Sequence, residues 1–237
     1  MSKKDKDRES ILKSVWEFSR ENFTDLVLVA VPIFMVAELV SSSLMGFVPV
    51  DDVAGNLIGS FLIGGLLKDL IGLVGVLTII YLVYDRVNGR KLSVNDAFKK
   101  ALGVFGDAVY TMLILNSLLF IGYLLLMIPG IVYGNYWVFT LVAVAVKGEK
   151  GRGALSASKK LVDGRWLNVF GTLLILGLIV QAPLLMVTLP ARLNGLQEYG
   201  ELISMMSNSF YELFFTVVVT VYYIYLAKTD SKKWVAW

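Results

Sequence analysis

Five polar residues that could bind an ion or a small solute lie inside stretches that are otherwise long and apolar. They are Glu38, Lys68, Asn135, Gln181 and Glu212. Charged side chains are costly inside a hydrocarbon core, so they mark either a contact between helices or a site for an ion or substrate. Counted from the predicted outer end of each stretch, all but Asn135 lie roughly 8–13 Å deep at 1.5 Å per residue, in the outer half of the bilayer, and Asn135 lies at a similar depth. We therefore expect them to form one polar layer.

Lys68 is the one basic residue of this set, and we expect its ammonium to pair with Glu38 or Glu212. The carboxylates outnumber the lysine, and Asp69 is adjacent, so one acid is expected to be protonated or to face a water-filled cavity. Three interpretations stay open for the layer. It is a polar clasp between helices, a substrate or ion site, or a set of side chains that reach out to the headgroups.

The elements that carry these residues are predicted to be transmembrane helices. The chain of 237 residues is 57% hydrophobic and 17% charged, and its apolar residues come in runs of the length that a bilayer requires. A broken helix at Lys68 is an alternative for the second span, and Pro129-Gly130 is expected to form the tight turn between spans three and four. Six spans are predicted, at about 24–44, 62–84, 104–128, 131–146, 166–189 and 207–227.

The basic residues are distributed unevenly along these spans. Twenty of the 22 Lys and Arg residues fall before the first span, after the second or fourth span, or after the last one. Loops on the cytoplasmic side carry an excess of Lys and Arg. Both termini are therefore predicted to be cytoplasmic, and residues 1–237 are predicted to form a single integral membrane domain.

The chain is predicted to repeat one unit three times, an amphipathic interfacial helix followed by a two-span hairpin. The interfacial helices are expected at about 9–21, 93–102 and 153–163. Ser93 and Asp96 fit a capping box, and Gly164 fits a C-cap. These helices are either elbows that orient the next span or a collar that lies apolar face down and contacts anionic lipid. The lysines of the collar are Lys99, Lys100, Lys159 and Lys160.

Several kinds of chemistry are excluded by composition. The chain has no histidine and no cysteine, which removes thiolate nucleophiles, histidine bases and the usual zinc and haem ligands. No catalytic motif is present, because Gly103-Val104-Phe105-Gly106-Asp107 departs from the pattern of intramembrane aspartyl proteases. We expect no catalytic residue, no metal and no cofactor. The net charge of +3 is explained by topology, so nucleic acid is not an expected partner.

One segment resembles a known family. It comprises Ile128-Pro129-Gly130-Ile131, Tyr136-Trp137, the pattern Ala154-Leu155-x-x-Ser158-x-x-Leu161-x-x-Gly164 and Val169-Phe170. Over about residues 120–175 it resembles the membrane domain of glycerophosphoryl diester phosphodiesterases and its stand-alone six-helix relatives in prokaryotic membranes. The resemblance implies a prokaryotic plasma membrane protein with a connection to lipid or envelope maintenance. The catalytic domain of that enzyme is absent here, so its activity is not carried over.

The leading interpretation is a non-enzymatic integral membrane protein that binds membrane lipid, another membrane protein or a second copy of itself. The alternative is a transporter or channel for a small solute or ion that uses the polar layer. Proline-interrupted spans favour the alternative, since Pro32 and Pro183 lie inside spans one and five.

Overall fold

The computed structural model describes the backbone of residues 3–45, 59, 65–125, 127–193 and 197–234. The described residues form helices and no strand. The helices are α1 (Lys3–Glu21), α2 (Phe23–Met45), α4 (Lys68–Val87), α5 (Val94–Leu125), α6 (Met127–Tyr136), α7 (Thr140–Lys147), α8 (Arg152–Val162), α9 (Trp166–Leu193) and α10 (Gln197–Trp234).

Six helical stretches of the described residues are long and apolar enough to cross a membrane, at 23–44, 65–87, 94–125, 127–147, 166–190 and 202–229. The chain is therefore an all-α protein with the helices of a multi-pass membrane protein, as predicted. The alternative of a broken helix at Lys68 stays a prediction, because residues 60–64 lie outside the described part of the chain and the α-helix begins at Lys68. Residues 65–67 form a π-helical turn, and the helix then continues through Lys68 to Val87.

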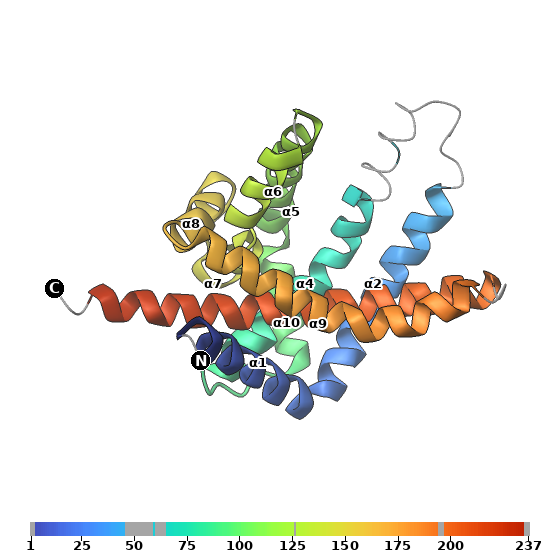
Figure 1. The fold of residues 1–237 in the computed structure, drawn as a ribbon, viewed down its shortest axis with the longest axis horizontal. Helices are drawn as coiled ribbons and strands as arrows, with labels where there is room; N and C mark the ends of the chain where they lie inside the picture. The colour runs from blue at the N-terminus through green and yellow to red at the C-terminus, as the bar shows by residue number, and fades with distance from the viewer. Residues whose placement is uncertain (1–2, 46–58, 60–64, 126, 194–196, 235–237) are drawn as a thin grey trace.

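The C-terminal helix lies at the centre of the fold. α10 packs against α1, α2, α4 and α9, and α4 also packs against α2 and α5. Figure 1 shows α9 and α10 running together across the molecule, while α2, α4, α5 and α6 stand across them. Leu213, Val217 and Leu77 lie in the interior where these helices meet. The crossing brings side chains from α2, α4 and α10 to one place.

The fourth span consists of two short helices, α6 and α7, separated by a turn at residues 137–139. A side chain from α8 bridges the turn. The hydroxyl of Ser158 donates to Tyr136 O at 2.8 Å and accepts from the Phe139 N–H at 3.1 Å. Ser158 is fully buried, and it supplies partners to two backbone groups that the turn leaves without helical ones.

Two of the three predicted interfacial helices are separate elements. α1 precedes α2 with only Asn22 between them, and α8 spans Arg152–Val162 close to the predicted 153–163. The predicted caps are confirmed as well. Ser93 Oγ accepts from the Asp96 N–H at 3.1 Å, and Gly164 has a φ of +71° after the end of α8.

The predicted interfacial helix at 93–102 is wrong as a separate element, because it forms the first turns of α5, which continues to Leu125. No strong helix breaker follows Leu102. Gly103 and Gly106 have open space around them, and a helix tolerates isolated glycines at a modest cost.

The apolar faces of α1 and α8 pack on protein rather than lying open for lipid. On α1, Ile11, Val15 and Phe18 are buried, and α1 packs against α9 and α10. On α8 the buried residues are the predicted face, Ala154, Leu155, Ser158, Leu161 and Val162, and they pack against α5, α6 and α7.

Pro129-Gly130 does not form the turn that was predicted between spans three and four. α5 ends at Leu125 and α6 begins at Met127, so both residues lie in the first turns of α6. Proline is tolerated there because the first N–H groups of a helix have no intrahelical acceptor. Gly122 and Gly130 instead allow α5 and α6 to approach closely, since a Cβ at Gly122 would lie 3.3 Å from the Gly130 Cα and a Cβ at Gly130 would overlap the ring of Tyr123.

Candidate functional site

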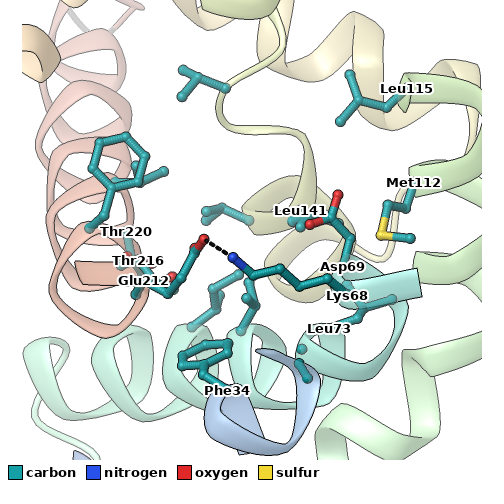
Figure 2. A pocket seen from close by; sticks show the side chains of 18 of the residues that line it. Phe34, Lys68, Asp69, Leu73, Met112, Leu115, Leu141, Glu212, Thr216 and Thr220 are labelled. Carbon is teal, nitrogen blue, oxygen red and sulfur yellow. Dashed lines mark hydrogen bonds and ion pairs between the residues drawn. The ribbon is translucent and has the colours of Figure 1, made fainter. Parts of the chain in front are cut away.

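Lys68 joins three spans at one point. Its Nζ lies 2.7 Å from Glu38 Oε1 on α2 and 3.8 Å from Glu212 Oε1 on α10. Figure 2 shows the lysine side chain extended from α4 toward Glu212. The side chains of Lys68 and Glu38 are only 24% and 15% exposed, so little solvent screens their attraction. The expected pairing is present, and it involves both acids.

The contact between Lys68 and Glu38 is a close ion pair. Glu38 Oε1 is buried and accepts no aligned hydrogen bond among the described residues, although the lysine nitrogen lies 2.7 Å away. The lysine therefore acts mainly as a counter-charge for this carboxylate.

A second acid, Asp69, lies next to Lys68 and is held by a residue that the sequence analysis did not select. Asn116 Nδ2 on α5 donates to Asp69 Oδ2 at 3.2 Å. An amide in the middle of the third predicted span was the signal that could have identified it. Figure 2 shows Asp69 directed away from Lys68. The two neighbouring side chains therefore contact different helices, Lys68 contacting α2 and α10 and Asp69 contacting α5.

These residues border a cavity of about 230 Å³ between α2, α4, α5, α7 and α10. Apolar side chains make up most of its wall. The polar residues of the wall are Lys68, Asp69, Asn116, Glu212, Thr216 and Thr220. The threonine hydroxyls donate to the carbonyls of Glu212 and Thr216 in their own helix, at 2.7 and 2.8 Å. Their oxygen atoms can then only accept, which suits a donor in the cavity.

The charges around the cavity are predominantly acidic. Glu212 and Asp69 line it directly, and Glu38 lies behind the lysine nitrogen. Two carboxyl groups thus pair with the one ammonium, and the third, of Asp69, is held by Asn116 on the cavity wall. A cation or hydrogen-bond donor of a ligand would find acceptors here, whereas an anion would find one partner, Lys68.

Asn135 and Gln181 do not join this cluster. They line a second cavity of about 400 Å³, which Val138 and Phe215 border in common with the first. Asn135 Nδ2 also donates to Trp166 O at 3.1 Å, which ties α6 to the start of α9. The expected single layer is therefore divided into two places. Depth counted along a helix does not give the direction in which a side chain points.

The four candidate lipid-contacting lysines are exposed, but they differ in their surroundings. Lys100 Nζ lies 2.7 Å from Asp85 Oδ2 and 5.6 Å from the ring centroid of Tyr81. Lys159 Nζ lies 5.7 Å from the ring centroid of Tyr136. Lys99 and Lys160 have no ion pair among the residues that the structure describes.

Arg86 forms a polar contact that the sequence analysis missed. Its guanidinium donates to Asp25 Oδ2 at 2.7 Å, to the side-chain oxygen of Asn22, and to Leu92 O at 3.0 and 3.2 Å. One side chain therefore fixes the start of α2, the end of α4 and the loop that follows. Arg86 lies at the end of its span, where a basic residue is ordinary, so nothing in the sequence distinguished it.

No group of three acidic residues in the described part of the chain is arranged to hold a metal ion. Comparison of the chain with models of known protein families, with curated proteins and with solved structures finds no match. The resemblance noted over residues 120–175 stays a prediction.

Proposed function

We propose that this chain is a non-enzymatic integral membrane protein that binds a small cationic solute in its central cavity and moves it across the membrane. The observation that carries the proposal is Lys68, held between Glu38 and Glu212 at the edge of a 230 Å³ cavity. Charged residues inside spans usually mark the path of an ion or substrate. This geometry favours the transport interpretation over the scaffold interpretation.

The lysine ammonium acts as a tethered counter-ion in this mechanism. It neutralises Glu38 and Glu212 when no solute is bound. An amine that enters the cavity offers a second cation to Glu212 and Asp69. The threonine oxygens accept hydrogen bonds from its remaining N–H groups. The wall is otherwise apolar, which strengthens each of these attractions relative to water.

Direct binding is the first test. Purified protein in nanodiscs is titrated with methylammonium, putrescine and glycine, and stabilisation is read from the unfolding midpoint and from adducts in native mass spectrometry. We expect an amine to bind, and Glu212→Gln to weaken its binding at least tenfold. Glu149→Gln is the matched control, because Glu149 is exposed and lies outside the cavity. Equal binding by both variants would remove the cavity from the proposal.

Transport is tested separately in proteoliposomes. Uptake of the amine that binds is measured against liposomes without protein. We expect uptake to fall at least tenfold in Glu38→Gln and Glu212→Gln and to persist in Glu149→Gln. Binding without uptake would leave a receptor or storage role for the same cavity and overturn the transport step.

The proposed location is a prokaryotic plasma membrane with both termini in the cytoplasm. The distribution of Lys and Arg supports this orientation. The chain has no cysteine, so single cysteines report accessibility directly. A membrane-impermeant maleimide added to whole cells is expected to label Asn194→Cys but not Asn88→Cys. The reverse pattern would invert the topology.

We also propose that the fold derives from three copies of a helix-plus-hairpin unit. α1 precedes the hairpin of α2 and α4, and α8 precedes the hairpin of α9 and α10. In the middle unit the first helix is continuous with its span, α5. Superposition of the three units on one another in an experimental structure tests this architecture.

A second candidate function is the binding of anionic lipid or of a membrane partner, including another copy of the chain. The specific observation in its favour is that Lys99 and Lys160 are exposed and lack ion pairs among the described residues. Their ammonium groups are therefore available to headgroups. Lys99→Gln combined with Lys160→Gln is expected to reduce retention of phosphatidylglycerol in native mass spectrometry, and unchanged retention would reject this candidate.

A further inference from the structure

A second feature of the molecule lies away from the central cavity, where α1 crosses α9 and α10. A groove of about 300 Å³ opens between these helices, and none of its lining residues borders the central cavity. Nearly all of its wall is apolar. The residues that define it include Val15, Trp16, Ser19, Ile179, Pro183 and Phe214.

The groove contains a hydroxyl group without a partner. Ser19 is 5% exposed, and its Oγ has no hydrogen-bond partner among the described residues. Several other helical serines of this chain donate to the carbonyl four residues earlier, as Ser14 does to Ser10 O at 3.0 Å and Ser209 to Met205 O at 2.9 Å. A buried hydroxyl that is left unpaired is unfavourable. Ser19 is therefore poised for a hydrogen bond to a group that enters the groove.

The opposite wall, on α9, contains a proline. Pro183 lies inside α9 and lines the groove. Proline has no N–H, so the carbonyl of Ile179, four residues earlier, lacks its helical donor. Ile179 lines the groove as well. The α9 wall of the apolar groove therefore includes the point where proline interrupts the hydrogen bonding of the helix.

We infer that this groove binds one acyl chain of a glycerophospholipid from the leaflet that contains α1. The chain occupies the apolar trough, and Ser19 donates a hydrogen bond to the ester carbonyl at its head. Trp16 lines the groove and is 69% exposed, which suits an indole at the headgroup level. Arg20 follows Trp16 by four residues, one turn further along the same side of α1, where its exposed guanidinium meets the lipid phosphate.

Lipid is the occupant that the surroundings favour. The groove is formed by α9 and α10, which have the composition of membrane spans, and by α1, which packs against both. Lipid acyl chains are therefore the apolar molecules present at high concentration around it. This inference is independent of the proposed transport, because the two sites share no residue.

The test uses nanodiscs of phosphatidylethanolamine and phosphatidylglycerol that contain a trace of phosphatidylglycerol with a diazirine in its acyl chain. After irradiation, labelled peptides are identified by mass spectrometry. We expect labelling concentrated on residues 12–19 and 176–184. Ile179→Trp, which fills the groove from a half-exposed position, is expected to reduce this labelling at least fivefold. Leu167→Trp, at a position of α9 that is 75% exposed and outside the groove, is expected to leave it within twofold.

A milder variant keeps the test decisive if Ile179→Trp fails to fold. Ser19→Ala removes only the hydroxyl, and we expect it to reduce the one-lipid adduct in native mass spectrometry at least threefold. Ser14→Ala is the matched control on the same helix, because the Ser14 hydroxyl already has a partner. Equal adducts in both serine variants, or labelling spread evenly over all exposed helix faces, would overturn the inference.

Discussion

Lys68 Nζ lies 2.7 Å from Glu38 Oε1, and this contact joins α4 to α2 within the outer half of the predicted bilayer span. Replacing the lysine with methionine keeps most of its length and removes the charge. Two carboxylates then lose their counter-ion in a poorly solvated place, which is strongly unfavourable. We expect Lys68→Met to lower the free energy of unfolding by about 1–3 kcal/mol, measured by denaturant unfolding in a mild detergent.

The double variant Lys68→Met/Glu38→Gln separates lost pairing from lost packing. It removes the uncompensated charge of Glu38 together with the lysine, so we expect it to recover at least half of the loss. Lys160→Met is the control, because this lysine is exposed and has no ion pair among the described residues. If the double variant were as unstable as Lys68→Met, the contact would be packing rather than electrostatics.

Local sequence signals predicted the elements of this fold well. Long apolar runs identified the six spans, since hydrocarbon thickness sets their length directly. Ser93 and Gly164 marked helix ends because capping depends on a few neighbouring residues. The pairing of Lys68 with the acids followed from depth and charge, which are both properties of the sequence.

Relationships between helices could not be predicted in the same way. Asn135 and Lys68 lie at similar depth, yet they line different cavities, because rotation of each helix is set by packing. Asn116 was missed because its partner, Asp69, is 47 residues away. Pro129-Gly130 reads as a turn in sequence, but proline also suits the first turn of a helix.

The contacts of Arg86 at the C-terminal end of α4 lead to a second stability prediction. Its planar guanidinium reaches Asp25, Asn22 and Leu92 O together, and a lysine ammonium cannot match that fork. We expect Arg86→Lys to lower the free energy of unfolding by about 1–2 kcal/mol. Arg90→Lys is the control, since the Arg90 side chain is 73% exposed and its guanidinium pairs with Asp85 at 3.3 Å without the fork of contacts that Arg86 makes. Equal effects of the two variants in denaturant unfolding would show that charge alone matters here.

The close packing of α6 on α5 at Gly130 leads to a third stability prediction. A Cβ at this position would overlap the ring of Tyr123 and force either the ring or the helix to move. We expect Gly130→Ala to destabilise the protein by about 1–3 kcal/mol. Gly134→Ala, four residues later, meets its neighbours only at 3.6–3.7 Å and is expected to be nearly neutral.

The companion variant Gly130→Ala/Tyr123→Ala removes the obstacle. Its stability is compared with that of Tyr123→Ala alone, in the same unfolding assay. We expect alanine at 130 to cost less than half as much in this background, because the added methyl group no longer meets the ring. An unchanged cost would indicate that the backbone of Gly122, rather than Tyr123, limits the space.

Ser158 gives the sharpest structural prediction, because one hydroxyl serves both sides of the break in the fourth span. Alanine at this position leaves the buried Phe139 N–H without its acceptor and the partly buried Tyr136 carbonyl without its donor. Unsatisfied buried groups cost about 1–3 kcal/mol each, so Ser158→Ala is expected to lower the free energy of unfolding by about 2–4 kcal/mol. Ser156→Ala, on the exposed side of the same helix, is expected to change it little. Hydrogen exchange should locate the loss at residues 136–140, and protection there that equals the wild-type value would mean that α6 and α7 are held by packing alone.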